Sequence, residues 1–202
     1  MKEGTQEEKQ KDTQEEQQKG PHRVPEEDAF VKEGNKVKIY PRGFKITWGN
    51  DDRYWKKLDG RIDCAAELKQ VSWLEVACST KEVKSGKTYK VGFEVSLKPD
   101  AFGWKDVDVY VMAKVGKSGK YIYKKFQLDK PLQRENICIP DDLKEPLKIN
   151  ATPPPSDMSK SPEIHFGLYE VWNKKWKGGL TINHAFIEET EPADPKNEES
   201  SS

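Results

Sequence analysis

The chain has 202 residues, in which 35 Lys and Arg side chains are balanced by 35 Asp and Glu. This length fits one domain of ordinary size. Hydrophobic residues make up 34% and charged residues 35%, a composition too polar for a chain that is compact from end to end, so we expect disordered segments. No apolar run is long enough to cross a bilayer, and we therefore expect no membrane insertion.

The two ends of the chain differ from its middle. Residues 1–35 are rich in Lys, Glu and Gln and lack apolar periodicity, which predicts a disordered arm without a secretory signal. Residues 189–202 form an acidic, Pro-containing tail that we also expect to be disordered. The folded domain is expected to span residues 36–188. Positions 36–187 hold 28 Lys and Arg against 19 Asp and Glu, so the zero overall charge conceals a basic core of +9.

The middle of the chain has the periodicity of β-strands. Residues 89–97 alternate apolar and polar side chains over nine positions, which is typical of a half-buried strand. Residues 71–78 are more uniformly apolar and suit a central strand. The other predicted strands are 44–48, 107–115, 121–126, 164–168 and 180–186.

Turn signals separate these strands and favour one fold class. Gly-containing turns follow several of them, at 85–87, 117–120 and 177–179. No segment has a long 3.6-residue period. Many short antiparallel strands favour an all-β, two-sheet antiparallel β-sandwich over a barrel. Residues 141–162, which include three consecutive prolines, are predicted to form a long loop before a last hairpin.

The three cysteines, Cys64, Cys78 and Cys138, are an odd number in a chain without a signal. We expect reduced thiols that pack as small buried hydrophobes. The sequence has no CxxC and no Cys/His cluster, so we expect no zinc or other metal site and no cofactor.

Catalytic signatures are missing from the sequence. There is no GxSxG, P-loop, HExxH or GxGxxG motif. His22 lies in the predicted arm, whereas His165 and His184 lie on predicted strands and are expected to be structural. A glycosidase would need two carboxyl groups facing one cleft. We therefore expect a protein that is not an enzyme.

Tryptophans beside polar side chains in connections are the most informative feature. Trp48 and Trp55 bracket the turn 49–52, and Trp172 and Trp176 flank three polar residues in the connection before the last predicted strand. Connections often carry binding residues. An indole face stacks on the C–H patch of a pyranose, while nearby polar groups pair with its hydroxyls. This pattern favours a sugar-binding site.

Packing offers an alternative role for the same rings. Composition alone equally allows Trp48 and Trp55 to fill the core. Trp176 could pin its loop to the sheet, and we expect Trp73 and Trp104 to be buried in the core.

Three blocks of sequence resemble a known family. Residues 44–55 (FKITWGNDDRYW), 66–76 (AELKQVSWLEV) and 166–180 (FGLYEVWNKKWKGGL) occur in family order within about residues 40–190. They resemble the plant phloem lectins and their Nictaba-like relatives. The resemblance implies a jelly-roll type of sandwich that binds N-acetylglucosamine oligomers of the chitin type and N-glycan cores.

The same resemblance has implications for partners and location. It implies homodimers, residence in the cytoplasm of phloem sieve elements and companion cells, association with filamentous phloem protein, and carriage of RNA. Nictaba has a run of four lysines for nuclear import, whereas this chain has only Lys124 and Lys125. The resemblance also implies nuclear residence, and the missing lysine run argues against it.

The resemblance also assigns the site residues. The two binding tryptophans of the family match Trp48 and Trp55, which would stack on sugar rings, with Asp51 in the turn between them. In the connection before the last predicted strand, Glu170 would accept hydrogen bonds from hydroxyls, and other side chains would contact hydroxyls or the acetamide. Nictaba has a polar residue at the position of Trp172. The expected carbohydrate-binding residues are Trp48, Asp51, Trp55, Glu170, Trp172, Asn173 and Lys174.

Two other functions remain open from the sequence. The basic core and its abundant aromatic residues also suit an RNA-binding transport protein. A structural partner of phloem filaments, attached through the arm 1–35, is the third hypothesis.

Overall fold

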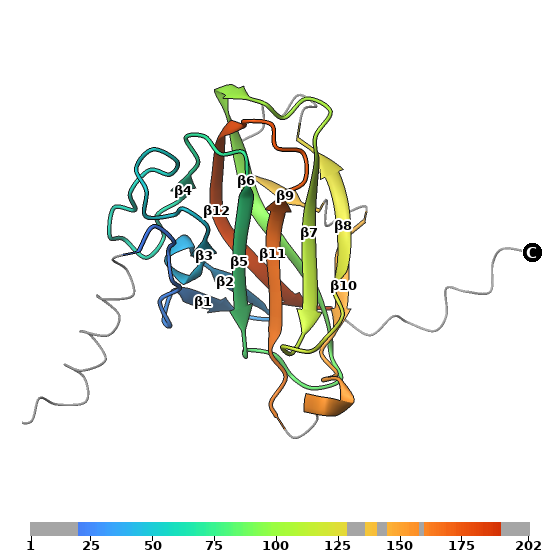
Figure 1. Cartoon of the computed structure of the whole chain (residues 1–202). Coiled ribbons are helices and arrows are strands. Elements are labelled where there is room, and N and C mark those ends of the chain that lie inside the picture. The colour runs from blue at the N-terminus through green and yellow to red at the C-terminus, as the bar shows by residue number, and fades with distance from the viewer. Residues whose placement is uncertain (1–19, 129–135, 141–144, 158–159, 191–202) are drawn as a thin grey trace, which may run out of the picture.

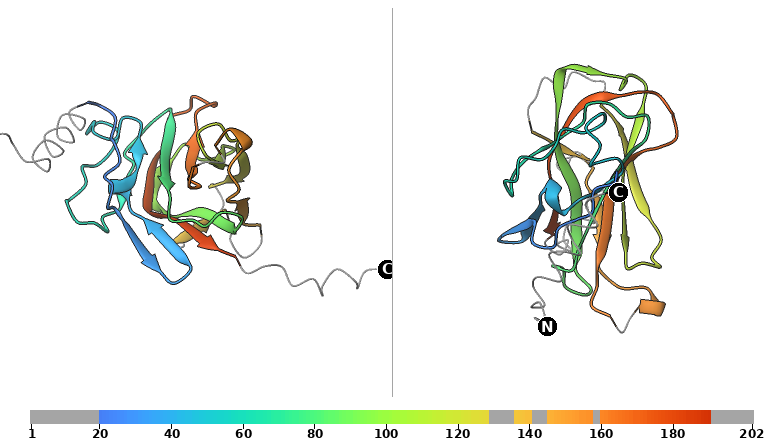
Figure 2. Two further views of the ribbon diagram at one scale, coloured as in Figure 1. Left: turned by 90° about the horizontal axis from the view of Figure 1, so that it is seen from below. Right: turned by 60° about the vertical axis from the view of Figure 1, so that its left-hand side comes forward.

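The computed structural model describes residues 20–128, 136–140, 145–157 and 160–190. Two sheets pack face to face (Figures 1 and 2), and the strand pairings within these ranges are antiparallel. The prediction of an all-β, two-sheet antiparallel sandwich is therefore confirmed.

The larger sheet has the order β1-β2-β12-β6-β10, with β4 paired to β12 and β9 paired to β6. Its strands are β1 (Phe30–Glu33), β2 (Lys36–Ile39), β4 (Ala66–Glu67), β6 (Thr88–Phe102), β9 (Ile137–Ile139), β10 (Leu147–Asn150) and β12 (Gly178–Glu189). The smaller sheet has the order β3-β5-β11-β7-β8. Its strands are β3 (Lys45–Ile46), β5 (Leu74–Thr80), β7 (Asp108–Val115), β8 (Ile122–Gln127) and β11 (Ile164–Glu170). Two single 3-10 turns, Pro41–Gly43 and Pro155–Asp157, complete the described elements.

The core lies between the sheets, where alternate side chains of both meet. In β7 every second side chain is buried, because successive residues of a strand point to opposite faces. Phe93 of β6 lies at the centre, with its ring centroid 6.0 Å from that of Phe44 and 5.8 Å from that of Phe166 of β11. These rings join the two sheets through apolar packing.

The long strands were predicted correctly, and the short strands β1, β2, β4, β9 and β10 were missed. The alternating segments correspond to β6, β7, β11 and β12, and the remaining predictions to β3, β5 and β8. The prediction of one long loop over 141–162 is wrong, because this stretch contains β10. Leu147 and Ile149 of β10 are buried beside β6, and two apolar residues are too few for a visible period.

The prediction of a disordered arm up to residue 35 is wrong for residues 20–35. Strand β1 pairs with β2 along its whole length, and the chain before it pairs with β3 through Arg23 and Ile46. Backbone hydrogen bonds to residues far along the chain order this polar segment, and its local composition does not record them. The rest of the predicted arm, residues 1–19, lies outside the described residues.

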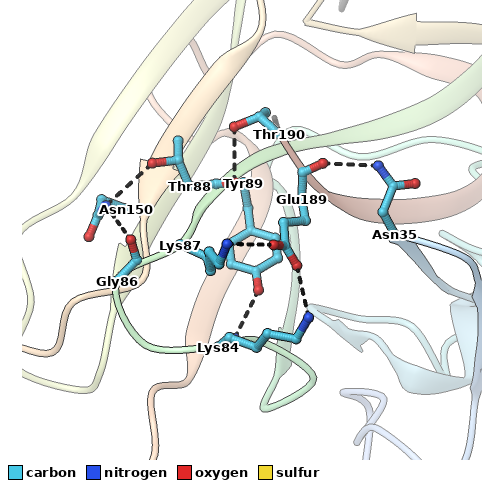
Figure 3. A network of polar contacts seen from close by, with 9 residues as sticks. All are labelled: Asn35, Lys84, Gly86, Lys87, Thr88, Tyr89, Asn150, Glu189 and Thr190. Carbon is cyan, nitrogen blue, oxygen red and sulfur yellow. Dashed lines mark hydrogen bonds and ion pairs between the residues drawn. The ribbon is translucent and has the colours of Figure 1, made fainter. Parts of the chain in front are cut away.

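The predicted C-terminal tail also begins later than expected. Glu189 still belongs to β12, and its carboxylate pairs with Lys84 and Lys87 at 3.4 Å (Figure 3). Asn35 donates its side-chain amide to the Glu189 carbonyl (3.0 Å), and the Thr190 amide donates to the Thr88 carbonyl (2.9 Å). These bonds extend the fold through residue 190, and the remainder of the tail lies outside the described residues.

The connection between β11 and β12 is not the tight last hairpin that the sequence suggested. β11 lies in the smaller sheet and β12 in the larger one, so residues 171–177 cross from one sheet to the other. In Figure 1 this crossing loop lies at the upper end of the sandwich, between β11 and β12.

The cysteines are free thiols, and Cys64 and Cys78 are buried as expected, whereas Cys138 is half-buried. Desolvation by burial raises the pKa of the Cys78 thiol well above its ordinary value. In the described part of the chain, no three His, Cys, Asp or Glu side chains are grouped as metal ligands would be. None of the described helices is long and apolar enough to span a membrane.

Trp55 and Trp73 have the opposite burial to that predicted from the sequence. The prediction that the Trp55 ring is open to solvent is wrong, because it packs in the core with 2% of its surface exposed. The prediction that Trp73 is buried is also wrong, since its ring is 47% exposed, while Trp104 is buried as expected.

These positions predict a large difference in stability between two tryptophan variants. Trp55→Ala should lower the free energy of unfolding by about 3–5 kcal/mol, because it leaves a cavity in the core. Trp73→Ala, the matched control, should cost about 1 kcal/mol or less. Urea unfolding followed by circular dichroism measures both, and equal losses would contradict the burial assignment.

Candidate functional site

Three segments that are distant in sequence meet at one end of the sandwich. They are the turn after β3 (47–55), the chain before β5 (69–73) and the crossing loop 171–177. The Thr47 amide donates to the Glu75 carbonyl (3.1 Å), and the Lys69 amide donates to the Tyr54 carbonyl (2.8 Å). Val71 and Lys177 exchange two backbone hydrogen bonds of 2.9 Å. The main chain therefore ties the three segments together.

Trp48 stands at the start of the first segment in a strained conformation. Its φ is +61°, a region that bulky side chains rarely adopt. Its backbone N–H donates to Nδ1 of His22 (3.0 Å), and its ring is 37% exposed. A Cβ on the following Gly49 would meet Ile46 and Arg23 at 2.7 and 2.8 Å. This crowding explains why glycine follows Trp48.

Asp51 fixes the turn rather than standing free. Its carboxylate accepts hydrogen bonds from the Arg53 backbone N–H (3.0 Å) and from the Arg53 guanidinium (2.7 Å to Oδ2). These bonds lower the pKa of Asp51 to about 2. The carboxylate is thus ionised at neutral pH, and a ligand at Asp51 would share it with Arg53.

Tyr54, one position before the buried Trp55, supplies the ring that faces the site. Its ring lies 6.3 Å from that of Trp176 at an interplanar angle of 20°, a stacked arrangement, and 5.9 Å from that of Trp48. The Tyr54 ring therefore joins the turn after β3 to the crossing loop. We define Trp48, Tyr54 and Trp176 as the aromatic cluster.

Sequence reasoning chose the wrong member of the Tyr54–Trp55 pair. Tyr54 is the last residue of a hydrogen-bonded turn and is half-buried, whereas Trp55 directly after it is buried in the core. Trp55 forms an antiparallel bridge with the buried Leu68, and this pairing places its ring in the core. Local sequence carries no signal for that pairing.

Trp73 adds another exposed indole at the same end of the sandwich. Its indole N–H donates to Oε2 of Glu75 (2.9 Å), and the hydroxyl of Thr47 donates to the same oxygen (3.1 Å). Glu75 on the outer face of β5 therefore links Trp73 to the residue before Trp48. Sequence reasoning missed Glu75, although its polar side chain within the apolar segment 71–78 was a signal.

Glu170 and Lys177 form a buried ion pair across the base of the crossing loop. Both side chains are almost completely buried. The other carboxylate oxygen of Glu170 accepts the backbone N–H groups of Trp172 (3.2 Å) and Asn173 (2.9 Å). Lys177 also donates to the carbonyl of Ser72, the residue before Trp73 (3.4 Å).

The prediction that Glu170 accepts hydrogen bonds from a sugar is therefore wrong for this structure. Its carboxylate is closed off from solvent and holds the crossing loop instead. The inward direction follows from the strand period, because Ile164, Phe166 and Leu168 of β11 are buried and Glu170 continues their face. This signal was present in the sequence.

The crossing loop presents the remaining predicted residues to solvent. Asn173 is exposed and accepts the Lys175 backbone N–H through its side-chain oxygen (3.0 Å), so its amide nitrogen takes no part in that bond. Lys174 is exposed and has a φ of +57°. Trp176 is 52% exposed and belongs to the aromatic cluster.

Trp172, at the other side of the crossing loop, is separated from the aromatic cluster. Its ring is 57% exposed and lies 4.7 Å from the ring of Tyr110 on β7, edge to face. The structure thus brings Trp48 and Trp176 together through Tyr54, whereas Trp172 packs over the outer face of the smaller sheet.

Two glycines let the end of the loop pack closely against its neighbours. A Cβ on Gly178 would collide with the Lys69 carbonyl oxygen, and Gly179 has a φ of +77°. The indole N–H of the buried Trp104 donates to the Gly178 carbonyl (2.9 Å). The Lys-Gly-Gly run therefore fixes the exit of the crossing loop and, with it, the position of Trp176.

The family model of Phloem protein 2 matches residues 34–188, most of the chain. The chain belongs to the Phloem protein 2 family. Protein PHLOEM PROTEIN 2-LIKE A9 of Arabidopsis thaliana is 37% identical over 174 residues, which cover 80% of this chain and 93% of that protein. All three segments of the site lie inside the region matched to the Phloem protein 2 family.

Other similar proteins match a shorter part of the chain or match it at much lower identity. A lectin of Luffa acutangula is 37% identical over 84 residues, or 38% of this chain and 40% of that protein. A solved family 16 carbohydrate-binding module is 10% identical and covers 79% of this chain and 90% of its own, with a TM-score of 0.36. A Podospora anserina GH26-CBM35 beta-(1,4)-mannanase is also 10% identical and covers 81% of this chain and 29% of its own, with a TM-score of 0.44. At these scores the two structures carry no inference about function.

The buried ion pair predicts that a nearly isosteric substitution of Glu170 strongly destabilises the fold. Glu170→Gln should lower the free energy of unfolding by about 3–5 kcal/mol, because it leaves the Lys177 ammonium buried without its counter-charge. Lys175→Gln, on the exposed side of the same loop, should change it by less than about 0.5 kcal/mol. Urea unfolding measures both, and equal stability of the two variants would contradict a structural role for Glu170.

Proposed function

We propose that this member of the Phloem protein 2 family is a lectin that binds N-acetylglucosamine oligomers and N-glycan cores at the aromatic cluster and catalyses no reaction. The observation that carries this proposal is the stacked Tyr54–Trp176 pair with Trp48 beside it. Trp48 and Trp176 remain partly open to solvent, with 37% and 52% of their surface exposed.

The chemistry of a pyranose ring suits this arrangement. One of its faces presents weakly positive C–H groups, and an indole or phenol face is apolar and electron-rich, so the two stack. The hydroxyl and acetamido groups around the rim of the sugar need hydrogen-bonding partners. Aromatic rings carried by segments far apart in sequence, with polar side chains between them, offer both kinds of contact.

The polar contacts are assigned to exposed side chains near the aromatic cluster. The amide nitrogen of Asn173 and the ammonium of Lys174 can donate to sugar oxygens, and the Asp51 carboxylate can accept from a hydroxyl while it stays paired with Arg53. Trp172 is placed at the outer edge of the site, where its ring would contact a further sugar unit of a longer oligomer.

The relatives support a sugar ligand. The similar protein of Luffa acutangula is a lectin, and the chain belongs to the Phloem protein 2 family. The blocks at 44–55, 66–76 and 166–180, which resemble the phloem lectins, contain the aromatic cluster and Trp73. The choice of N-acetylglucosamine rests on that resemblance, as do the proposed location in the phloem cytoplasm and the proposed homodimer.

Affinity is expected to depend on the length of the oligomer. A single N-acetylhexosamine of about 15 heavy atoms gains only about 4–5 kcal/mol at roughly 0.3 kcal/mol per atom. That free energy corresponds to a dissociation constant of about 1 mM. Contacts to consecutive sugar units, or linked sites in a dimer, are needed for tighter binding.

Substitution of the exposed rings tests the proposal. Trp48→Ala and Trp176→Ala should each raise the dissociation constant for an N-acetylglucosamine trimer about tenfold or more, because about 1.4 kcal/mol of stacking is lost. Tyr121→Ala removes a similarly exposed ring that lies against Lys114 of β7, near the end of β11 opposite to the crossing loop, and should bind like the unchanged protein. Titration calorimetry with oligomers of one to five units gives these constants. Unchanged binding by both tryptophan variants would remove the stacking mechanism.

Salt dependence separates the lectin from an RNA-binding protein. The basic core favours the second function, and phosphate contacts release counterions, so RNA affinity would fall steeply with salt. Stacking on a neutral sugar should change less than about twofold between 50 and 200 mM NaCl, whereas an RNA complex with several phosphate contacts should weaken by about 10³-fold. Glycan binding that fell as steeply as this would contradict stacking as its basis. Tight RNA binding without glycan binding would replace the lectin proposal.

The third hypothesis, a structural partner of phloem filaments, loses part of its proposed attachment point. Residues 20–35 of the predicted arm belong to the fold, and only residues 1–19 remain as a candidate tether. We keep filamentous phloem protein as a proposed partner and give the aromatic cluster no role in that contact.

A further inference from the structure

A segment before the matched region contacts the turn that carries Trp48. The matched region begins at residue 34, yet residues 20–23 lie against the turn that carries Trp48. Arg23 and Ile46 exchange two backbone hydrogen bonds of 2.9 and 3.2 Å. Asn50 donates its amide to the Pro21 carbonyl (3.1 Å) and its side-chain nitrogen to the Gly20 carbonyl (3.0 Å). We call residues 20–23 the N-terminal strap.

His22 is the member of the strap that touches Trp48 directly. Its Nδ1 accepts the Trp48 backbone N–H (3.0 Å), and its ring centroid lies 4.8 Å from that of the indole. Nδ1 must be unprotonated to accept this bond, so the neutral ring carries its proton on Nε2. One side chain therefore holds both the backbone and the ring of Trp48.

The backbone of Trp48 needs such support. A bulky residue with positive φ costs about 1–3 kcal/mol and keeps that conformation only when its surroundings impose it. The β-carbon of Arg23 closes against Gly49, and the Arg23 guanidinium pairs with Glu26 (3.4 Å), which in turn pairs with Arg42 (2.8 Å). These contacts anchor the strap to the 3-10 turn before β3.

We propose that the N-terminal strap is part of the ligand site and that His22 is a positioning residue for Trp48. This inference rests on the proposed function, because the ligand is the same N-acetylglucosamine oligomer. Without the strap, Trp48 relaxes to other backbone conformations, and only the fraction that is correctly placed can bind. The affinity of this chain then depends on residues that the family match does not include.

Two truncations form a matched pair for the test. Deletion of residues 1–19 keeps every strap contact described above, whereas deletion of residues 1–23 removes them all. The first should bind an N-acetylglucosamine trimer like the full chain, and the second should bind about tenfold more weakly. Equal affinity of the full chain and of both truncated chains would overturn the proposal.

Single substitutions at His22 isolate the hydrogen bond. His22→Ala removes the acceptor and should raise the dissociation constant about three- to tenfold, as expected for the loss of one hydrogen bond. His22→Asn places a carbonyl oxygen near the position of Nδ1 and should restore most of the affinity, whereas His22→Gln places its oxygen elsewhere and should not. Because His22 is exposed, thermal unfolding should change little in all three variants. Equal binding by the Ala and Asn variants would argue against the hydrogen bond.

A readout without sugar distinguishes failure of the strap from failure of the lectin. The Trp48 backbone amide, followed by hydrogen exchange in the ligand-free protein, should exchange at least tenfold faster in His22→Ala than in the unchanged chain or in His22→Asn. Unchanged exchange would overturn the positioning role whatever the ligand is. Faster exchange with unchanged affinity would show that the strap lies outside the ligand site. Absence of glycan binding by the unchanged protein would sink the proposed function, and the role of the strap in binding with it.

Discussion

The buried Glu170–Lys177 ion pair is the constraint on which the site depends. Removing two charges from water is costly, and the attraction between them offsets that cost only when they stay together and their other bonding capacity is used. Glu170 also accepts hydrogen bonds from two backbone N–H groups of the crossing loop, and Lys177 also donates to the Ser72 carbonyl. The loop between the sheets is therefore held at both of its ends. Its tryptophans, Trp172 and Trp176, stand outside because the charged residues take the inner positions.

A full core explains why several large rings can remain at the surface. Phe44, Phe93 and Phe166 already join the two sheets, and Trp55 and Trp104 fill the space towards the site end of the sandwich. A close-packed interior has no room for further rings of this size. Trp48 and Trp176 consequently keep exposed faces, and their neighbours restrict their motion. A rigid exposed ring loses little conformational entropy when a ligand covers it, which favours binding over a purely structural role.

Sequence patterns could predict what depends on neighbouring residues and not what depends on distant partners. Strands β6, β7, β11 and β12 follow from a period of two, and the inward direction of Glu170 follows from the same period. The buried position of Trp55 depends on Leu68, and the exposure of Trp73 depends on how the chain enters β5 beside Lys177. Likewise, the polar residues 20–23 have no pattern of their own and are ordered by bonds to Ile46 and Asn50. The family resemblance pointed to segments that the structure brings together at one end of the sandwich, whereas tertiary pairing determines which ring in each segment is exposed.

The way the site is assembled also bears on how related chains could differ. Its rings are joined by backbone bonds among segments near residues 20, 50, 70 and 175, and backbone bonds place few demands on side-chain identity. The sandwich and the crossing loop can therefore stay the same while the strap before residue 34 varies in sequence. Trp48 has a strained backbone. A change in the strap therefore alters how often Trp48 adopts its binding conformation, and it leaves unchanged the contacts that Trp48 makes in that conformation. Affinity for the proposed ligand can then be adjusted without altering the exposed rings of the aromatic cluster.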